Sequence, residues 1–258
     1  MPDFSIVTPS LNQGAFLGEC LASVREAAAR ARVRVRHIVM DGGSRDDSLE
    51  ILRSTQDIEW VSEADNGQTD AINKGLARVD GGIVSYLCAD DLLEPDSLRW
   101  VGEAFSKSPE VDVVHGDALF LENGWKRRKV SGPFDYARLR RGNFLFQPAV
   151  FWRHGVTKRC GLLDASLRYC MDHEYWLRIG AVTRWHYIPE PLASCRLHAD
   201  AKTWSSLVPA WDEAQTMQAR YGIRWRPLRD ALWMRFGGCH YYRLKRHIFA
   251  ALARRRAA

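Results

Sequence analysis

Short apolar runs alternate with segments of helical spacing through the first half of the chain. The apolar runs predict strands at Phe4–Thr8, Val33–Met40, Ile58–Val61, Ile83–Cys88 and Val111–His115. The helical spacings predict helices at Ala15–Ala31, Asp47–Ser54, Thr69–Val79 and from Pro95 onward. Such alternation is typical of an α/β fold, a mostly parallel sheet with helices on both faces.

The second half of the chain is less regular. It is predicted to hold a hairpin turn at 122–124, helices at Tyr169–Gly180 and Ser205–Tyr221, and a strand at Arg184–Ile188. Two amphipathic segments follow, with apolar residues four apart from Leu228 and again from Leu244. We therefore divide the chain into an α/β domain, residues 1–204, and a helical basic extension, residues 205–258.

The composition limits the class of protein. Hydrophobic residues make up 46% and charged residues 26% of the 258 positions, which excludes wholesale disorder. No apolar run is long enough to span a membrane, and the first residues do not form a signal peptide. The six cysteines contain no CxxC pair, which disfavours a zinc ribbon and a disulfide framework. These features predict a reduced, cytoplasmic protein.

The positive charge is concentrated at the C-terminus. Residues 224–258 hold ten basic side chains and one acidic one, whereas the other residues hold 27 basic and 30 acidic ones. A basic segment rich in aromatic residues, on a nearly neutral body, predicts contact with an anionic membrane surface. The protein is then expected at the inner face of the membrane. A nucleic-acid partner is disfavoured, since the body shows no supporting motif.

Polar residues follow three of the predicted strands. Pro9, Ser10 and Asn12 follow the first, Asp41 ends the second, and an Asp90–Asp91 pair follows the fourth. Ligands of open α/β sheets bind at the carboxyl ends of the strands, so we expect these residues to share a site. The first turn has no GxGxxG motif, and the chain has no GxxxxGK[ST] loop, which disfavours nicotinamide and P-loop enzymes.

Paired carboxylates at a strand end have two chemical uses. They bind a hard divalent cation, which can bridge to the phosphates of a nucleotide, or they perform acid–base catalysis. A purely structural alternative is that Asp90 and Asp91 cap the helix predicted from Pro95.

Several segments together resemble family 2 glycosyltransferases of the GT-A fold. They are FSIVTPSLN, HIVMDGGSRDDS, SEADNGQTDAINKGL, YLCADDLLEPDSL, GLLDASLRYCMDHEYWLRI and SCRLHAD, in the order of the family and over residues 4 to 200. The resemblance implies a Rossmann-like mixed sheet. It also implies transfer of a hexose or N-acetylhexosamine from a nucleotide diphosphate, with inversion and with Mg²⁺ or Mn²⁺.

The resemblance also implies a donor site. Residues of its nucleotide-proximal segments are Pro9, Ser10, Asn12, Asp41, Asp70, Lys74 and Asp90. Asp41 would accept a hydrogen bond from the base, which suits uracil and hence a UDP-sugar. Asp91 would be the metal ligand. The family's fuller motif is Asp-x-Asp, and in this sequence Ala89 occupies the position of its first aspartate.

The remaining implied residues lie in the second half. Asp172 matches the catalytic base, with Glu174 as its competitor; as an alternative, Asp172 only caps its helix. His198 matches a position that reaches the metal or diphosphate, unless it is structural. Gln147 matches a segment that borders the donor sugar, unless it lies in a polar turn before a strand.

The function expected from the sequence is thus transfer to a saccharide or lipid-linked saccharide during surface-polysaccharide or glycoconjugate assembly. Two other interpretations stay open. One is a nucleotidyltransferase, which the lack of a basic residue in TPSLNQG disfavours. The other is a degenerate binding module without catalysis, which the joint presence of Asp41, Asp91 and Asp172 disfavours. A homodimer is a further option.

Overall fold

The computed structural model describes residues 3–122, 125–198 and 207–223. These residues belong to two compact units. The first runs to Ser166 and resumes over Met171–Arg196; the second comprises Leu167–Cys170 and the chain from Leu197. The predicted domain boundary at 204/205 and both amphipathic tail segments lie outside the described residues, so they stay predictions.

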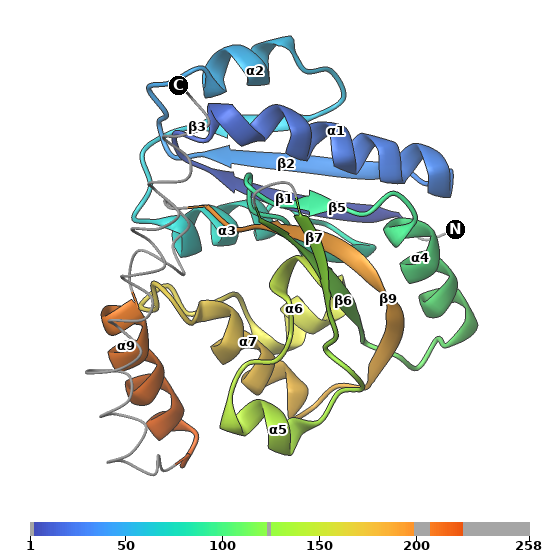
Figure 1. Cartoon of the computed structure of the whole chain (residues 1–258), viewed down its shortest axis with the longest axis vertical. Helices are drawn as coiled ribbons and strands as arrows, with labels where there is room; N and C mark the ends of the chain where they lie inside the picture. Colours follow the sequence, from blue (N-terminus) through green and yellow to red (C-terminus); the bar gives the residue numbers. More distant parts are fainter. Residues whose placement is uncertain (1–2, 123–124, 199–206, 224–258) are drawn as a thin grey trace. The chain divides into compact units, whose positions relative to one another are not determined.

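Nine strands of the described chain form one sheet in the order β3-β2-β1-β4-β8-β6-β9-β5, with β7 paired to β6. The strands are β1 (Phe4–Ser10), β2 (Val35–Asp41), β3 (Glu59–Ser62), β4 (Ile83–Tyr86), β5 (Leu92–Leu93), β6 (Val113–Glu122), β7 (Trp125–Lys129), β8 (Val150–Arg153) and β9 (Trp185–Arg196). The first four strands in this order are mutually parallel, whereas β8 runs antiparallel to both of its neighbours. The predicted mixed, mostly parallel α/β fold is confirmed (Figure 1).

The helices connect these strands. They are α1 (Gly14–Ala31), α2 (Ser48–Ser54), α3 (Gln68–Leu76), α4 (Ser97–Lys107), α5 (Tyr136–Arg141), α6 (His154–Cys160), α7 (Met171–Gly180) and α9 (Leu207–Arg220), with a 3₁₀ turn at Gln147–Ala149. Within the first unit, α1 and α2 lie on one face of the parallel strands and α3 on the other (Figure 1). None of the helices that the structure describes is long and apolar enough to cross a membrane.

Burial on both faces explains the unbroken apolar runs of the parallel strands. In β1, Ile6 belongs to the core cluster that includes Val24 of α1. Its neighbour Val7 contacts α3 at Gly75, where an added Cβ would come within 2.3 Å of a Val7 methyl. Gly75 therefore allows α3 to pack closely on the sheet.

The antiparallel half is held by aromatic side chains. Trp152 of β8 contacts Tyr175 and Trp176 of α7 edge-to-face, with ring centroids 5.6 and 5.7 Å apart. The Trp152 indole also donates a hydrogen bond of 2.8 Å to Thr157. This cluster fixes the position of α7, whose first turn carries Asp172.

Candidate active site

The carboxyl ends of β1, β2 and β4 lie side by side. Ser10 pairs with Asp41 in the β1–β2 register, and Val7 pairs with Tyr86 in the β1–β4 register. The structure thus brings together the three polar strand ends predicted from the sequence, including Pro9 at the end of β1. The Ser10 hydroxyl is buried and has no hydrogen-bond partner in the described part of the chain, as expected of a group that binds a ligand.

Asp41 organises the loop that follows β2. Its carboxylate, 2% exposed, accepts hydrogen bonds from the N–H groups of Gly43 and Ser44 and from the hydroxyls of Ser44 and Ser62, at 2.5–3.1 Å. Three of these bonds fall on Oδ2 and one on Oδ1, so Oδ1 keeps acceptor capacity for a further donor. The predicted contact with a base is compatible with this geometry.

Asn12 ties the first strand end to the same loop. It adopts a left-handed conformation with φ of 52°, which Asn tolerates better than most residues. Its N–H donates to the Ser44 hydroxyl at 2.7 Å, and its side-chain oxygen accepts from the Arg45 N–H at 2.9 Å. Asn12 therefore shapes the edge of the predicted nucleoside pocket.

Asp70 and Lys74 face each other on α3. The Lys74 ammonium lies 3.5 Å from Asp70 and 2.9 Å from Glu63. A backbone hydrogen bond from Asn66, assisted by the charge of Lys74, lowers the pKa of Asp70. The two residues form an ion pair beside the loop that precedes α3, and their predicted nucleotide contacts remain untested.

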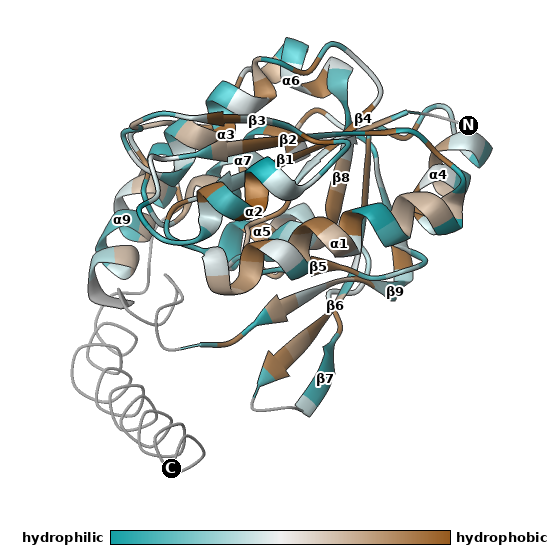
Figure 2. Ribbon diagram, turned by 90° about the horizontal axis from the view of Figure 1, so that it is seen from above, coloured by the Kyte–Doolittle hydropathy of each residue, from teal (hydrophilic) through white to brown (hydrophobic). Residues whose placement is uncertain are grey.

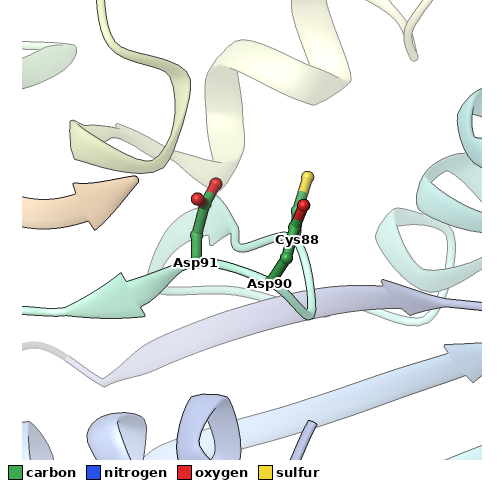
Figure 3. Close-up of side chains that lie close together, drawn as sticks. All are labelled: Cys88, Asp90 and Asp91. Atoms are coloured by element: carbon green, nitrogen blue, oxygen red, sulfur yellow. The ribbon is translucent and has the colours of Figure 1, made fainter. Parts of the chain in front are cut away.

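The loop between β4 and β5 carries the acid pair. The ligand atoms of Cys88, Asp90 and Asp91 all lie within 4.8 Å of one another, and their side chains point to the same side of the loop (Figure 3). Desolvation, followed by the like charge of Asp90, raises the pKa of Asp91 well above its usual range. The capping alternative fails, because β5 intervenes and α4 begins only at Ser97.

These residues fit a hard divalent cation. Two carboxylates supply the oxygen ligands that Mg²⁺ and Mn²⁺ prefer. A cation would offset both the desolvation and the like charge of Asp90 that raise the pKa of Asp91. On the neighbouring β9, the N–H of Arg196 donates to Asp91 at 3.3 Å. The Arg196 guanidinium pairs with Glu19, while its buried Nε has no partner among the described residues.

Asp172 sits in the first turn of α7. Its Oδ1 accepts from the N–H of His173 at 2.7 Å, and its Oδ2 accepts from the side-chain amide of Asn143 at 2.9 Å. Burial raises the pKa of Asp172, and these hydrogen bonds together with His173 oppose the rise. A carboxylate whose pKa is raised is a stronger base, which suits acceptance of a proton.

Tyr86 is affected by the charges of both carboxylate centres. Its hydroxyl is buried without a partner among the described residues. After burial, the nearby charge of Asp172 is the largest cause that raises the pKa of Tyr86, and Asp91 contributes as well. Both carboxylates therefore act electrostatically on the same phenol.

Glu174, the predicted competitor of Asp172, is engaged elsewhere. Its carboxylate forms a two-point ion pair with Arg178 at 2.9 Å and is 8% exposed. Arg178 in turn donates to the backbone oxygens of Cys160 and Leu162. These contacts give Glu174 a structural role in joining α7 to the end of α6.

Gln147 lies beside the acid loop. Its amide donates to the Tyr86 carbonyl at 2.5 Å, and its oxygen lies 3.8 Å from the Cys88 sulfur. It is the first residue of the 3₁₀ turn before β8, as the polar-turn alternative predicts, and it also borders the site.

His198 follows β9 by two residues and belongs to the second unit. Its predicted contact with the metal or diphosphate stays a prediction.

Three residues without a role predicted from the sequence also lie at the site: Asn143, Arg196 and Gln68. Asn143 contacts Asp172, Arg196 contacts Asp91, and the Gln68 amide lies 3.1 Å from the Cys88 sulfur. Asn143 stands four residues before Gln147, and Arg196 lies in the segment SCRLHAD. In the sequence, only their proximity to predicted site residues marks Asn143 and Arg196. The fold is needed to show which side chains contact each other.

Solved structures share this architecture. TarS from S. aureus in complex with UDP-GlcNAc superposes with a TM-score of 0.69 at 13% identity, over 83% of this chain and 65% of that one. The mannosyltransferase PcManGT from Pyrobaculum calidifontis, in complex with GDP-Man and Mn²⁺, gives 0.64 at 16% identity, over 98% and 75%. The domain thus has the GT-A fold of glycosyltransferases, with an acid pair after β4.

Sequence relatives identify the family. The sequence profile described as "Glycosyl transferase family 2" matches residues 5–159. An uncharacterized glycosyltransferase of Mycobacterium tuberculosis is 31% identical over 70% of each chain. A PGL/p-HBAD biosynthesis glycosyltransferase of Mycobacterium bovis is 28% identical over 72% of this chain and 75% of its own. The chain belongs to glycosyltransferase family 2, and the protein is a glycosyltransferase.

Proposed function

We propose that the protein transfers a hexose or N-acetylhexosamine from a UDP-sugar to an acceptor hydroxyl, with inversion and with help from Mn²⁺ or Mg²⁺. The observation that carries this proposal is the presence of two half-buried carboxylate centres whose charges both act on Tyr86. One centre, Asp90 with Asp91, suits a cation and a diphosphate. The other, Asp172, is set up to exchange a proton.

The donor half of the proposal concerns binding. The unpartnered Ser10 hydroxyl and the shaped Asn12–Asp41 loop support a nucleoside pocket at the end of β1. A cation held by Asp91, with Asp90 beside it, would neutralise the diphosphate and stabilise its charge as it leaves. The buried Nε of Arg196 supports a further contact with phosphate oxygens.

The acceptor half concerns Asp172. The acceptor oxygen bonds to the anomeric carbon as the bond from that carbon to the diphosphate oxygen breaks, and the hydroxyl proton passes to Asp172. UDP leaves with the electrons of the broken bond. Attack from the face opposite the diphosphate inverts the anomeric configuration. The support is the place of Asp172 in the first turn of α7, its hydrogen bonds from His173 and Asn143, and its raised pKa.

UDP is favoured as the carrier for a chemical reason. The Oδ1 of Asp41 retains acceptor capacity, and the imide N–H of uracil is a donor. The neighbour TarS was solved with UDP-GlcNAc and PcManGT with GDP-Man, so the fold itself accommodates more than one base.

For the acceptor, we propose a saccharide or lipid-linked saccharide of surface-polysaccharide or glycoconjugate assembly, handled at the inner face of the membrane. The name of the Mycobacterium bovis relative, a PGL/p-HBAD biosynthesis glycosyltransferase, supports glycoconjugate assembly. The basic residues of 224–258, which lie outside the described structure, support attraction to anionic lipid.

A thermal-shift screen tests the proposal. UDP-sugars with Mn²⁺ should raise the melting temperature, because a ligand that binds only the folded state stabilises it. The shift should disappear in EDTA, and Mn²⁺ alone should give a smaller one. Stabilisation by GDP- or TDP-sugars instead of UDP-sugars would show that the donor carries another nucleobase. Binding of a donor without release of UDP by hydrolysis or transfer would favour a non-catalytic binding module.

A further inference from the structure

The β6–β7 hairpin displays a cluster of cations that the proposed catalytic site does not use. Strand β7 reads Trp-Lys-Arg-Arg-Lys over Trp125–Lys129 and pairs antiparallel with the end of β6. Figure 2 shows this hairpin standing away from the helices around the sheet, with β7 largely hydrophilic. Successive side chains of a strand point to opposite faces, so the cations occur on both faces of β7.

One of these cations anchors the hairpin. Arg128 binds Asp117 at 2.8–2.9 Å and the Pro189 carbonyl at 2.5 Å. Asp117 is fully buried and also accepts from the Ser131 N–H and the Tyr187 hydroxyl. This network ties β7 to the body of the sheet, so the strand is held in a defined orientation.

Of the other cations, Lys126 and Arg127 are exposed and Lys129 is half-buried. Lys126, Arg127 and Lys129 form no ion pair within the residues described by the structure; the Lys129 ammonium lies 5.6 Å from the centre of the Phe120 ring. The large apolar side chains on either side are also exposed, Trp125 at 78% and Val130 at 63%. We call Trp125, Lys126, Arg127, Lys129 and Val130 the basic hairpin surface.

We infer that the basic hairpin surface docks on an anionic phospholipid bilayer. The complementary charges are the lysine and arginine side chains on the protein and the phosphate-bearing headgroups on the membrane. Tryptophan prefers the boundary between headgroups and acyl chains, which accounts for an indole exposed beside cations. Because the hairpin stands away from the helices of the described chain, it can approach a flat surface.

The sheet connects this surface to the acid loop. Arg196, whose N–H binds Asp91, pairs with Leu121 of β6, and Leu121 pairs with Lys126 of β7. Lys126 is therefore two strand spacings from Arg196, about 10 Å. Docking would hold the acid loop near the bilayer, which suits a lipid-linked acceptor. This last consequence rests on the proposed function, whereas the membrane contact does not.

Co-sedimentation of the full chain with vesicles tests the inference. The vesicles contain phosphatidylcholine alone or with phosphatidylglycerol. We expect binding only to the anionic vesicles, and a fall of at least about tenfold in the partition coefficient for Lys126→Glu/Arg127→Glu. The matched control, Arg25→Glu/Lys158→Glu, changes the net charge equally at exposed positions of α1 and α6 and should bind as the wild type does.

A second variant isolates the indole. Trp125→Ser keeps the charge and should weaken binding by several-fold. Stabilisation by UDP with Mn²⁺ is measured on every variant and checks folding independently of the membrane. If a charge-reversal variant fails to fold, Lys126→Gln/Arg127→Gln replaces it.

Three outcomes would overturn the inference. Absence of binding by the wild type is the first. Equal binding by the hairpin and control variants is the second, and would assign any membrane contact to the rest of the chain. The third is a hairpin-dependent thermal shift with inorganic pyrophosphate while vesicle binding stays unchanged, which would indicate a soluble phosphate-bearing ligand. Because none of these readouts measures transfer, failure here is distinct from failure of the proposed catalytic function.

Discussion

Asp91 and Asp172 are both half-buried, but their surroundings differ. Asp91 lies beside a second carboxylate, Asp90, whose like charge adds to desolvation in raising the pKa of Asp91. Asp172 has no carboxylate among the main causes of its shift; it receives hydrogen bonds from the His173 N–H and from Asn143. Both pKa values are raised, but only the acid loop concentrates negative charge.

The contrast indicates different roles for the two carboxylate centres. A pair of like charges is stabilised by a cation, so the acid loop suits metal and diphosphate. The electrostatic interaction with His173 and the hydrogen-bond donors stabilise a single carboxylate, and Asp172 keeps the capacity to take a proton. The first turn of a helix also favours a negative side chain, which helps to keep Asp172 ionised in the absence of a metal. Three predictions test these roles.

The largest effect is expected at the acid loop. Asp91→Asn removes a charged oxygen ligand but keeps the shape of the side chain. We expect kcat/KM to fall by about 10³-fold or more, because charge stabilisation and donor binding are lost together. Titration calorimetry with UDP and Mn²⁺ should show weakened binding. Asp80→Asn, at an exposed carboxylate outside the acid loop and the donor site, serves as the control. Full activity of the wild type in EDTA would refute the role of the metal.

The second prediction separates the two acids of α7. Asp172→Asn should lower kcat by about 10²–10⁴-fold and leave UDP affinity nearly unchanged, because a base acts in the transition state. Glu174→Gln should instead lower the free energy of unfolding by roughly 1–3 kcal/mol, since it weakens the bonds to Arg178. Steady-state kinetics and denaturant titration measure the two effects. Loss of kcat in Glu174→Gln, with Asp172→Asn active, would make Glu174 the base.

The parallel half of the sheet could be predicted from the sequence for a physical reason. Strands such as β1 and β2 are buried on both faces, and their apolar runs end where polar residues begin. Because parallel strands place their carboxyl ends together, the proximity of Ser10, Asp41 and the acid loop followed from the order of elements alone.

The other half was harder to predict. Strand β5 has only two residues, and β8 follows a 3₁₀ turn that contains Pro148, so neither shows a periodic pattern. The contact between Asn143 and Asp172 joins a loop to a helix 29 positions away, and no local rule reports it. The ion pair of Glu174 with Arg178 has ordinary helical spacing, but only its burial indicates a structural role.

The smallest effect is expected at Asn143, which acts on Asp172 rather than on substrate. A base works when deprotonated, so the rate should fall as the pH drops through the pKa of Asp172. Burial raises that pKa, and the Asn143 hydrogen bond lowers it again. Asn143→Ala should therefore move the acid limb of the kcat–pH profile to higher pH by about one unit or less. At pH values well above this limb, kcat should change little. Asn143→Asp should move the limb further in the same direction, because it adds a like charge.

The control is Asn66→Ala, which removes a side-chain hydrogen bond from Asp70 in the same way and should leave the limb in place. An unmoved limb in both Asn143 variants would show that this amide does not tune the base.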